Sequence, residues 1–234
     1  MHTWAFAIGS GTLRGDIAHR FAGYDLVVVD GQEVTHRQVA TLHAGGALVL
    51  GYLDAGTIEP YRPWFRRAKP YRLDYWKQWG EWYANVDAAG FRRLIVGVAS
   101  SFERKGLDGL FLDNTDMIET HARQAPGMKR LVAALAKLVH DRDGFLFAQN
   151  GADVGGPIFR YLDGWNREDV GTDPGAVHDL RAMRARGLLT LATGYVKAAS
   201  SSAVHRDIRL ACRAGALPFV SNLALTRIPA PPHC

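Results

Sequence analysis

Short apolar runs that stop on polar residues recur along this 234-residue chain. They are Leu26–Val29 before Asp30, Leu48–Leu53 before Asp54, Leu110–Leu112 before Asp113, Phe145–Ala148 before Gln149 and Tyr161–Trp165 before Asn166. A strand buried on both faces reads as a continuous apolar run, and helix-like segments separate most of these runs. The pattern therefore predicts alternating strands and helices whose polar ends share one rim.

We expect eight strands, at about 4–8, 25–30, 47–54, 108–114, 144–149, 161–166, 188–195 and 217–221. Helices are expected at about 34–44, 90–105, 126–140, 175–187 and 202–214. Eight strands alternating with helices predict an α/β fold, a single-domain (β/α)8 TIM barrel over residues 1–234. An open doubly wound sheet is the alternative, although no Gly-x-Gly-x-x-Gly fingerprint follows a strand.

The connection after the third predicted strand, residues 55–89, is long and rich in Trp and Tyr. A short extra strand is expected near 82–86. Long insertions in compact domains tend to be functional, and aromatic rings pack well on the C–H faces of sugars. Two or three of these rings, with Trp82 as the chosen candidate, are predicted to face substrate, and the others to form a small core of the insertion.

Composition excludes few classes of protein. The net charge of +5 comes from Lys and Arg spread along the chain, without a nucleic-acid motif, so we expect a basic surface and no nucleic-acid partner. No eighteen-residue apolar stretch is present, so no membrane span is expected. The start lacks the pattern of a signal peptide. We expect a secreted or periplasmic protein whose export signal is absent from this sequence, or a cytoplasmic protein if Met1 is the native start.

Other catalytic chemistries find little support in the sequence. The histidines lack metal-ligand spacing and the serines lack a nucleophile elbow, so neither a metal hydrolase nor a serine hydrolase is expected. We predict no cofactor, no metal and a monomer. Cys212 and Cys234 could pair, but two cysteines define no framework. The Pro-rich end, residues 229–232, is expected to be a frayed tail.

Several segments match one family in the same order. Gly51–Arg62 fits the pattern Y-x-x-x-G-x-x-E-x-[YW]-R, and Asp108–Asp116 fits D-G-[VL]-x-x-D-N-x-D. Further matches are Gln149–Gly151, Asp163–Asp169 and Pro218–Ser221. Over nearly its whole length, the chain resembles the glycoside hydrolase family 114-like barrels, which include endo-α-1,4-polygalactosaminidases. The Pel-polysaccharide hydrolases are a neighbouring group.

The resemblance implies a barrel that hydrolyses α-1,4-linked galactosamine or N-acetylgalactosamine polysaccharide, such as a microbial exopolymer or biofilm matrix. By motif position it makes Asp113 the nucleophile and Glu168 the acid/base, if the retaining mechanism applies. Glycoside cleavage needs one ionised and one protonated carboxyl flanking the bond, which two strand ends can provide. A carbohydrate-binding barrel that has lost turnover, and a glycosidase for another α-linked sugar, are the alternatives.

The remaining candidates for substrate contacts are Asp30, Tyr52, Asp54, Glu59, Asn114, Asp116, Asn150, Asn166, Tyr195 and Trp82. Asn150 and Asn166 could instead orient a catalytic carboxylate, and Tyr52 and Tyr195 could hydrogen-bond the nucleophile. Several have a structural reading as well. Asp113 and Asp116 could cap the next helix, and Asp30 could bind backbone amides. Glu59 could pair with Arg62. An acidic rim would suit a cationic amino sugar, whereas the six Lys and Arg residues at 62–77 would not attract one.

Overall fold

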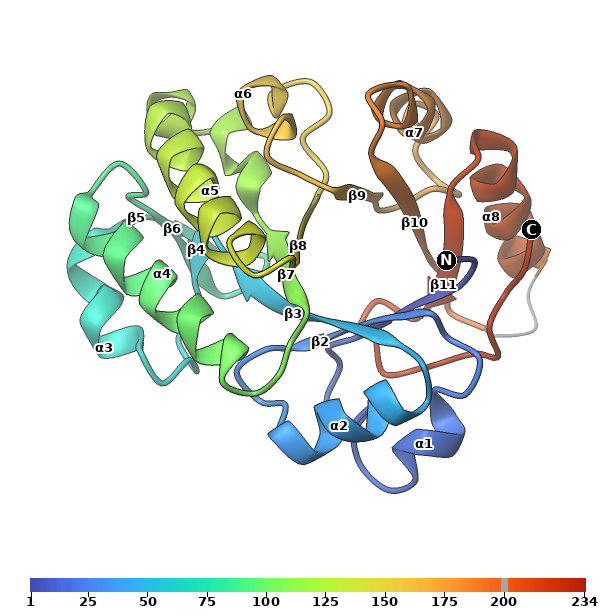
Figure 1. Ribbon diagram of the computed structural model, residues 1–234. Helices are drawn as coiled ribbons and strands as arrows, with labels where there is room; N and C mark the ends of the chain where they lie inside the picture. The colour runs from blue at the N-terminus through green and yellow to red at the C-terminus, as the bar shows by residue number, and fades with distance from the viewer. Residues whose placement is uncertain (199–201) are drawn as a thin grey trace.

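A computed structural model describes residues 1–198 and 202–234. Its main sheet has eight parallel strands in the order β1-β2-β3-β7-β8-β9-β10-β11, bent into a nearly closed barrel (Figure 1). These strands are β1 (Trp4–Ala7), β2 (Leu26–Asp30), β3 (Leu48–Asp54), β7 (Gly109–Asp113), β8 (Phe145–Gln149), β9 (Gly164–Arg167), β10 (Leu189–Tyr195) and β11 (Leu217–Ser221). The predicted TIM barrel and its eight strands are confirmed.

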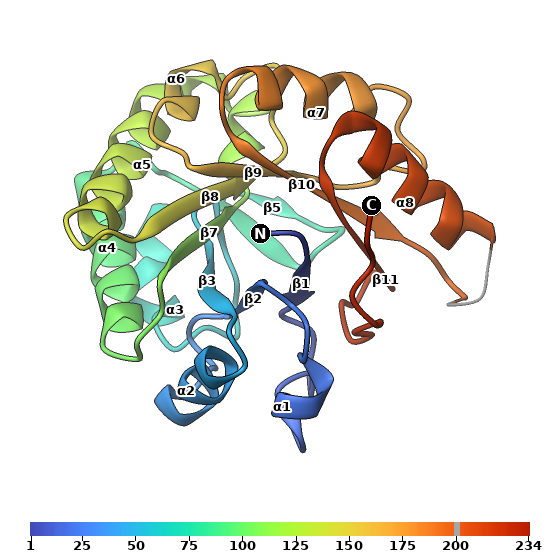
Figure 2. The ribbon, with the colours of Figure 1, turned by 45° about the vertical axis from the view of Figure 1, so that its right-hand side comes forward.

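Helices surround the sheet on its outer side, as Figure 2 shows from a second direction. They are α1 (Ile17–Arg20), α2 (His36–Ala44), α3 (Phe65–Ala68), α4 (Ala89–Glu103), α5 (Ala125–His140), α6 (Gly156–Phe159), α7 (Ala176–Ala185) and α8 (Ser202–Ala214), with short 3-10 turns at Lys69–Tyr71, Thr115–Glu119 and Ala122–Gln124. The five predicted helices are present, and the short α1, α3 and α6 were missed. Within the described ranges, every helix is too short or too polar to cross a lipid bilayer.

Aromatic side chains fill the inside of the barrel. Phe6 and Phe111 pack with ring centroids 5.0 Å apart, and Trp4 lies 5.5 Å from Phe219. Trp4 Nε1 also donates to the carbonyl of Leu217 at 2.8 Å, which joins the first strand to the last. Because successive residues of a strand face opposite sides, the alternate positions nearer the carboxyl ends also point inward, above this aromatic layer. These positions build the site.

The aromatic insertion forms a small sheet of its own. Its strands β4 (Thr57–Ile58), β5 (Arg72–Trp76) and β6 (Glu81–Ala84) are antiparallel, in the order β4-β6-β5. The single strand expected near 82–86 corresponds to β6. The strand β5 was missed because most of its residues are exposed or only half-buried, and so it carries no apolar run.

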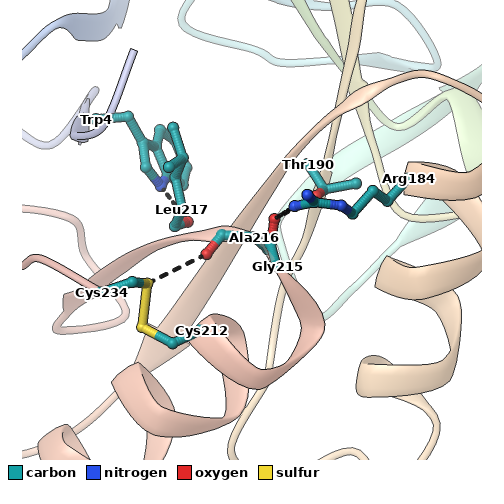
Figure 3. The surroundings of a disulfide bond; sticks show 8 residues. All are labelled: Trp4, Arg184, Thr190, Cys212, Gly215, Ala216, Leu217 and Cys234. Atoms are coloured by element: carbon teal, nitrogen blue, oxygen red, sulfur yellow. Dashed lines mark hydrogen bonds between the residues drawn. A yellow bond between two sulfur atoms is a disulfide. The ribbon is translucent and has the colours of Figure 1, made fainter.

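The C-terminal segment packs against the barrel, so the expectation of a frayed tail is wrong. Cys234 forms a disulfide with Cys212 of α8 (Figure 3). Further back, Tyr24 donates its hydroxyl to the carbonyl of Pro229 at 2.8 Å, and Leu225 is buried. These contacts give the Pro-rich end partners that its composition does not reveal.

Candidate active site

A cleft of about 430 Å³ opens at the carboxyl ends of the barrel strands. Six acidic residues line it: Glu59, Glu81, Asp113, Asp116, Glu168 and Asp169. The remaining lining side chains, all within the described ranges, include no Lys, Arg or His. This is notable on a chain whose formal net charge is +5. The cleft therefore concentrates negative charge on an otherwise basic protein and favours a cationic ligand.

Asp113 ends β7 and is held by three donors. The Tyr52 hydroxyl donates to Oδ2 at 2.5 Å, Gln149 Nε2 donates to Oδ1 at 2.6 Å, and the Asn114 backbone N–H donates to Oδ1 at 2.7 Å. Burial raises the pKa of Asp113, and these three hydrogen bonds oppose that rise. The donors fix the orientation of the carboxylate and favour its ionised form.

Glu168 follows β9 directly, on the far side of β8 from Asp113. Tyr195 donates its hydroxyl to Oε1, and Asn150 Nδ2 donates to Oε2 at 2.6 Å. Burial, together with the negative charge of Asp113, raises the pKa of Glu168 to about 7. A carboxyl with such a pKa can carry a proton near neutral pH, whereas the three donors at Asp113 favour its ionised form. Acid-assisted glycoside cleavage needs such a difference between its two carboxyl groups.

A buried chain of polar side chains supports Asp113 from below. Thr193 Oγ1 donates to Asn166 Oδ1 at 3.0 Å, and Asn166 Nδ2 donates to Gln149 Oε1 at 3.2 Å. Gln149 then has its amide nitrogen facing Asp113. Thr193 and Asn166 are fully buried. Each amide could point either way, and the carboxylate of Asp113, which can only accept when ionised, favours the orientation in which Gln149 donates.

The residues that follow Asp113, Gln149 and Glu168 have a left-handed backbone. Asn114, Asn150 and Asp169 have φ angles of 54°, 59° and 55°. Such angles are uncommon for residues other than glycine, with Asn and Asp enriched among the exceptions. The carbonyl of Asn114 lies so close to Gly56 that a Cβ there would be 1.8 Å away. These sharp turns direct the chain away immediately after Asp113, Gln149 and Glu168.

Four of the predicted substrate-binding residues do not line the cleft: Asp30, Asp54, Asn166 and Trp82. Asn166 belongs to the buried chain beneath Gln149. Asp54 accepts the backbone N–H groups of Gly56 and Thr57 and the Nδ2 of Asn114 at 2.8 Å, so it fixes the rim from behind. Trp82 packs on Phe65 and Tyr75, with ring centroids 5.7 and 4.8 Å away. Trp82 therefore belongs to the small core of the insertion and does not face substrate.

Asp30 and Glu59 meet at one buried cation. Arg62 donates from Nη1 to Asp30 at 2.6 Å and from Nη2 to Glu59 at 3.0 Å. Asp30 also accepts the backbone N–H groups of Gln32 and Glu33, which is its structural reading. Glu59 lines the cleft as well, although its oxygens already bond Arg62 and the Tyr61 hydroxyl. Arg62 is thus turned away from the cleft and neutralises charge behind it.

Two further acidic residues of the cleft, Asp116 and Glu81, have raised pKa values. Burial, then the charge of Asp113 and others nearby, raises the pKa of Asp116 to about 7. Burial is also the main cause that raises the pKa of Glu81 to about 7, although Thr57 donates to its Oε2 at 2.6 Å. Asp116 was predicted at the site and lies there, as do Tyr52, Asn114, Asn150 and Tyr195, whereas Glu81 and Asp169 were missed.

Carboxylate oxygens of Asp54, Glu59 and Glu81 lie within 4.8 Å of one another, a spacing that a cation could bridge. Each of these groups already accepts hydrogen bonds from the protein: Asp54 from Gly56 and Thr57, Glu59 from Arg62, and Glu81 from Thr57. Hydrogen-bond donors of the protein therefore already stabilise the three carboxylates that a metal ion would otherwise bind. Catalysis without a metal stays a prediction.

A parallel barrel with a carboxylate-lined cleft at the carboxyl ends of its strands has the architecture of a glycoside hydrolase. The chain belongs to glycoside-hydrolase family GH114, whose profile matches residues 1–224. The family predicted from the sequence motifs is therefore confirmed. No curated protein sequence matches the chain.

Solved structures share the fold at low sequence identity. Ega3 of Aspergillus fumigatus, in complex with galactosamine, has a TM-score of 0.81 and 19% identity, covering 100% of this chain and 95% of that one. The glycoside hydrolase domain of PelA from Pseudomonas aeruginosa has a TM-score of 0.78 and 20% identity, with 97% and 96% coverage. An α-galactosidase from Thermus thermophilus is more distant, with a TM-score of 0.67, 10% identity and 98% and 58% coverage.

Proposed function

We propose that the protein is an endo-acting hydrolase of α-1,4-linked galactosamine polymers that carry free amino groups. The observation that carries this proposal is the lining of the cleft, which has six acidic and no basic residues within the described part of the chain. A deacetylated galactosamine unit bears an ammonium group near neutral pH, which such a cleft attracts. An N-acetylated or neutral sugar would gain nothing from that charge. The galactosamine bound to Ega3, a protein of similar fold, agrees with this choice.

The chemistry follows from the two carboxyl groups. Asp113, ionised and fixed by three donors, attacks the anomeric carbon and displaces the leaving oxygen, which takes the proton of Glu168. Glu168, now ionised, then removes a proton from water, and this water hydrolyses the glycosyl ester on Asp113. The pKa of about 7 suits Glu168 to give and take a proton near neutral pH. Retention of configuration is the expected stereochemical outcome.

Asp116 is the candidate for holding the substrate's ammonium. It lines the cleft beside both catalytic carboxyls, whose charges help to raise its pKa. Among the described residues, the donor to its carboxylate is its own backbone N–H, and no other residue bonds it. An ammonium group would supply a second partner. Export of the protein and a monomeric state remain predictions.

The test is hydrolysis of purified, partly deacetylated α-1,4-galactosaminogalactan, with released oligosaccharides measured by mass spectrometry. Wild-type protein is expected to give a ladder of products, and Asp113→Asn and Glu168→Gln none. The same assay on fully N-acetylated polymer should give far less product. Binding of the polymer without release by the wild type would favour the carbohydrate-binding alternative. Release from another α-linked polysaccharide alone would mean that the sugar is wrong.

A further inference from the structure

Large hydrophobic side chains are left exposed around the cleft. Tyr61, Trp79 and Leu223 are 65%, 49% and 62% exposed, and all three line it. Across the described residues, only Met1, Tyr75 and Phe145 are comparably exposed. Folding gains nothing from aromatic surface left in water, and clustered exposure of this kind marks a binding surface. The insertion hairpin supplies two of the cleft's aromatic residues, Trp76 and Trp79.

The two indole rings of the hairpin are held in place by the protein. The backbone N–H groups of Trp79 and Gly80 donate to the carbonyl of Trp76 at 3.2 and 2.9 Å, which makes a tight turn between β5 and β6. Trp76 stacks on Tyr83 with centroids 5.0 Å apart and planes at 13°. Trp79 meets the edge of Trp76 at 6.3 Å and 76°. Rings fixed before binding lose little entropy when a ligand arrives.

A carboxylate stands directly beside these rings. Glu81 is the cross-strand partner of Trp76 and lines the same cleft. Its Oε2 accepts a hydrogen bond from Thr57, which leaves Oε1 for a ligand. An amino sugar has an apolar C–H face that packs on an indole and an ammonium group that both a π-face and a carboxylate attract. Neither a neutral sugar nor an apolar peptide would use all of these features.

We propose that Trp76, Trp79 and Glu81 form a binding subsite for an amino-sugar unit of the polymer next to the units at the cleaved bond. This inference rests on the proposed function for the identity of the polymer. The subsite lies on the hairpin of the insertion, whereas Asp113 and Glu168 lie on barrel strand ends. Its contacts are therefore made equally in the ground state and the transition state. Such contacts lower KM for long substrates and leave kcat unchanged.

The experiment compares Trp79→Ala with wild type on two substrates, a long deacetylated galactosamine polymer and a short aryl α-galactosaminide that cannot reach the hairpin. We expect kcat/KM on the polymer to fall about tenfold, and on the short substrate by less than about twofold. Trp79→Phe, which keeps a ring, should retain part of the activity on the polymer. Equal losses on both substrates, or no loss on the polymer, would overturn the subsite.

Tyr75→Ala is the matched control. Tyr75 belongs to the same strand as Trp76 and is 53% exposed, but it packs on Trp82 and does not line the cleft. Its removal should leave kcat/KM unchanged on both the polymer and the short substrate. Melting temperatures of all variants, measured alongside, separate loss of binding from loss of folding.

A binding measurement distinguishes this inference from the proposed function. Retention of each protein by the galactosamine polymer in affinity electrophoresis needs no turnover. If wild type is retained without cleaving the polymer and Trp79→Ala is not retained, the subsite stands and the hydrolase assignment fails. If wild type cleaves and both proteins are retained equally, the subsite fails alone. Neither retention nor cleavage by wild type would overturn both.

Discussion

At the amino ends of the barrel strands, Asp108 and Asp163 each accept hydrogen bonds from two donors. Asp108 bonds the backbone N–H of Val49 at 2.7 Å and His43 at 2.8 Å. Asp163 bonds the backbone N–H of Leu146 at 2.8 Å and a histidine, His140, at 2.9 Å. At the carboxyl ends, by contrast, six acids share one cleft that no basic side chain of residues 1–198 or 202–234 lines.

The two ends therefore use the same residue type for different purposes. An Asp-Gly pair precedes both β7 and β9, and in each case the Asp ties its strand to the neighbouring strand and to the end of a helix. These bonds stabilise the fold. The crowded acids of the cleft repel one another and lose hydration, so we expect them to reduce stability, a cost that is typical of groups placed for chemistry. In TIM barrels generally, one end carries function and the other stability.

The largest expected effect is at the carboxyl end. Asp113→Asn should lower kcat about a thousandfold or more, because the amide cannot form the glycosyl ester. Glu168→Gln should lower it about 10² to 10⁴-fold on the polymer, and much less on a substrate whose leaving group needs no proton. Neither variant should lower the melting temperature, since each removes a carboxyl group whose ionised form burial disfavours. A large loss of melting temperature with full turnover would make Asp113 a structural cap.

The next effect belongs to the amino end. Asp163→Ala removes the acceptor of both Leu146 N–H and His140, and should lower the free energy of unfolding by about 1–3 kcal/mol. Asp163→Asn keeps an oxygen for the Leu146 N–H and should lose less. Denaturant unfolding gives the stability, and kcat per folded molecule should equal that of wild type. A loss of kcat with unchanged stability would break the contrast between the two ends.

The pH dependence of stability sharpens the same contrast. A carboxyl whose folded pKa is raised supports the fold fully below its unfolded pKa and loses that support as pH rises through the folded pKa. For Glu81 the window runs from 4.5 to about 7. Glu81→Gln, whose amide oxygen still accepts from Thr57, should therefore gain stability relative to wild type across this window, by about 1 kcal/mol at pH 8.

The measurement is the free energy of unfolding of both proteins between about pH 4 and about pH 8, a range that spans the window. An exposed Glu33→Gln variant is the control and should follow the wild-type curve. If Glu81→Gln also parallels wild type across this range, the crowding of charge at Glu81 is not a source of instability.

Much of this arrangement was visible in the sequence, and the reason is local. Apolar runs ending on Asp113 and Asp30 mark strands and their carboxyl ends without any knowledge of the fold. Which strand-end side chains face the cleft depends on register and on distant segments, such as the partnership of Asp30 with Arg62. The cleft-lining roles of Trp79 and Glu81 depend on a hairpin whose exposed strand has no apolar pattern. Asn166 was predicted to bond substrate or to orient a catalytic carboxylate, and it lies one layer below the cleft, bonded to the Gln149 that donates to Asp113. Sequence alone could not decide between these two roles.

The smallest effect concerns that lower layer, where a residue far from the cleft acts on Asp113 through two amides. Thr193→Val has nearly the same shape but leaves Asn166 Oδ1 without a donor, so Asn166 holds the amide of Gln149 less firmly. The hydrogen bond from Gln149 to Asp113 would weaken, and the pKa of Asp113 would rise further. The acid limb of the pH profile of kcat/KM should shift to higher pH, so that the loss of activity is small near about pH 8 and grows as pH falls. Thr193→Ser keeps the hydroxyl and should restore the wild-type profile. A uniform loss at every pH, with a lower melting temperature, would instead mean that Thr193 serves only packing.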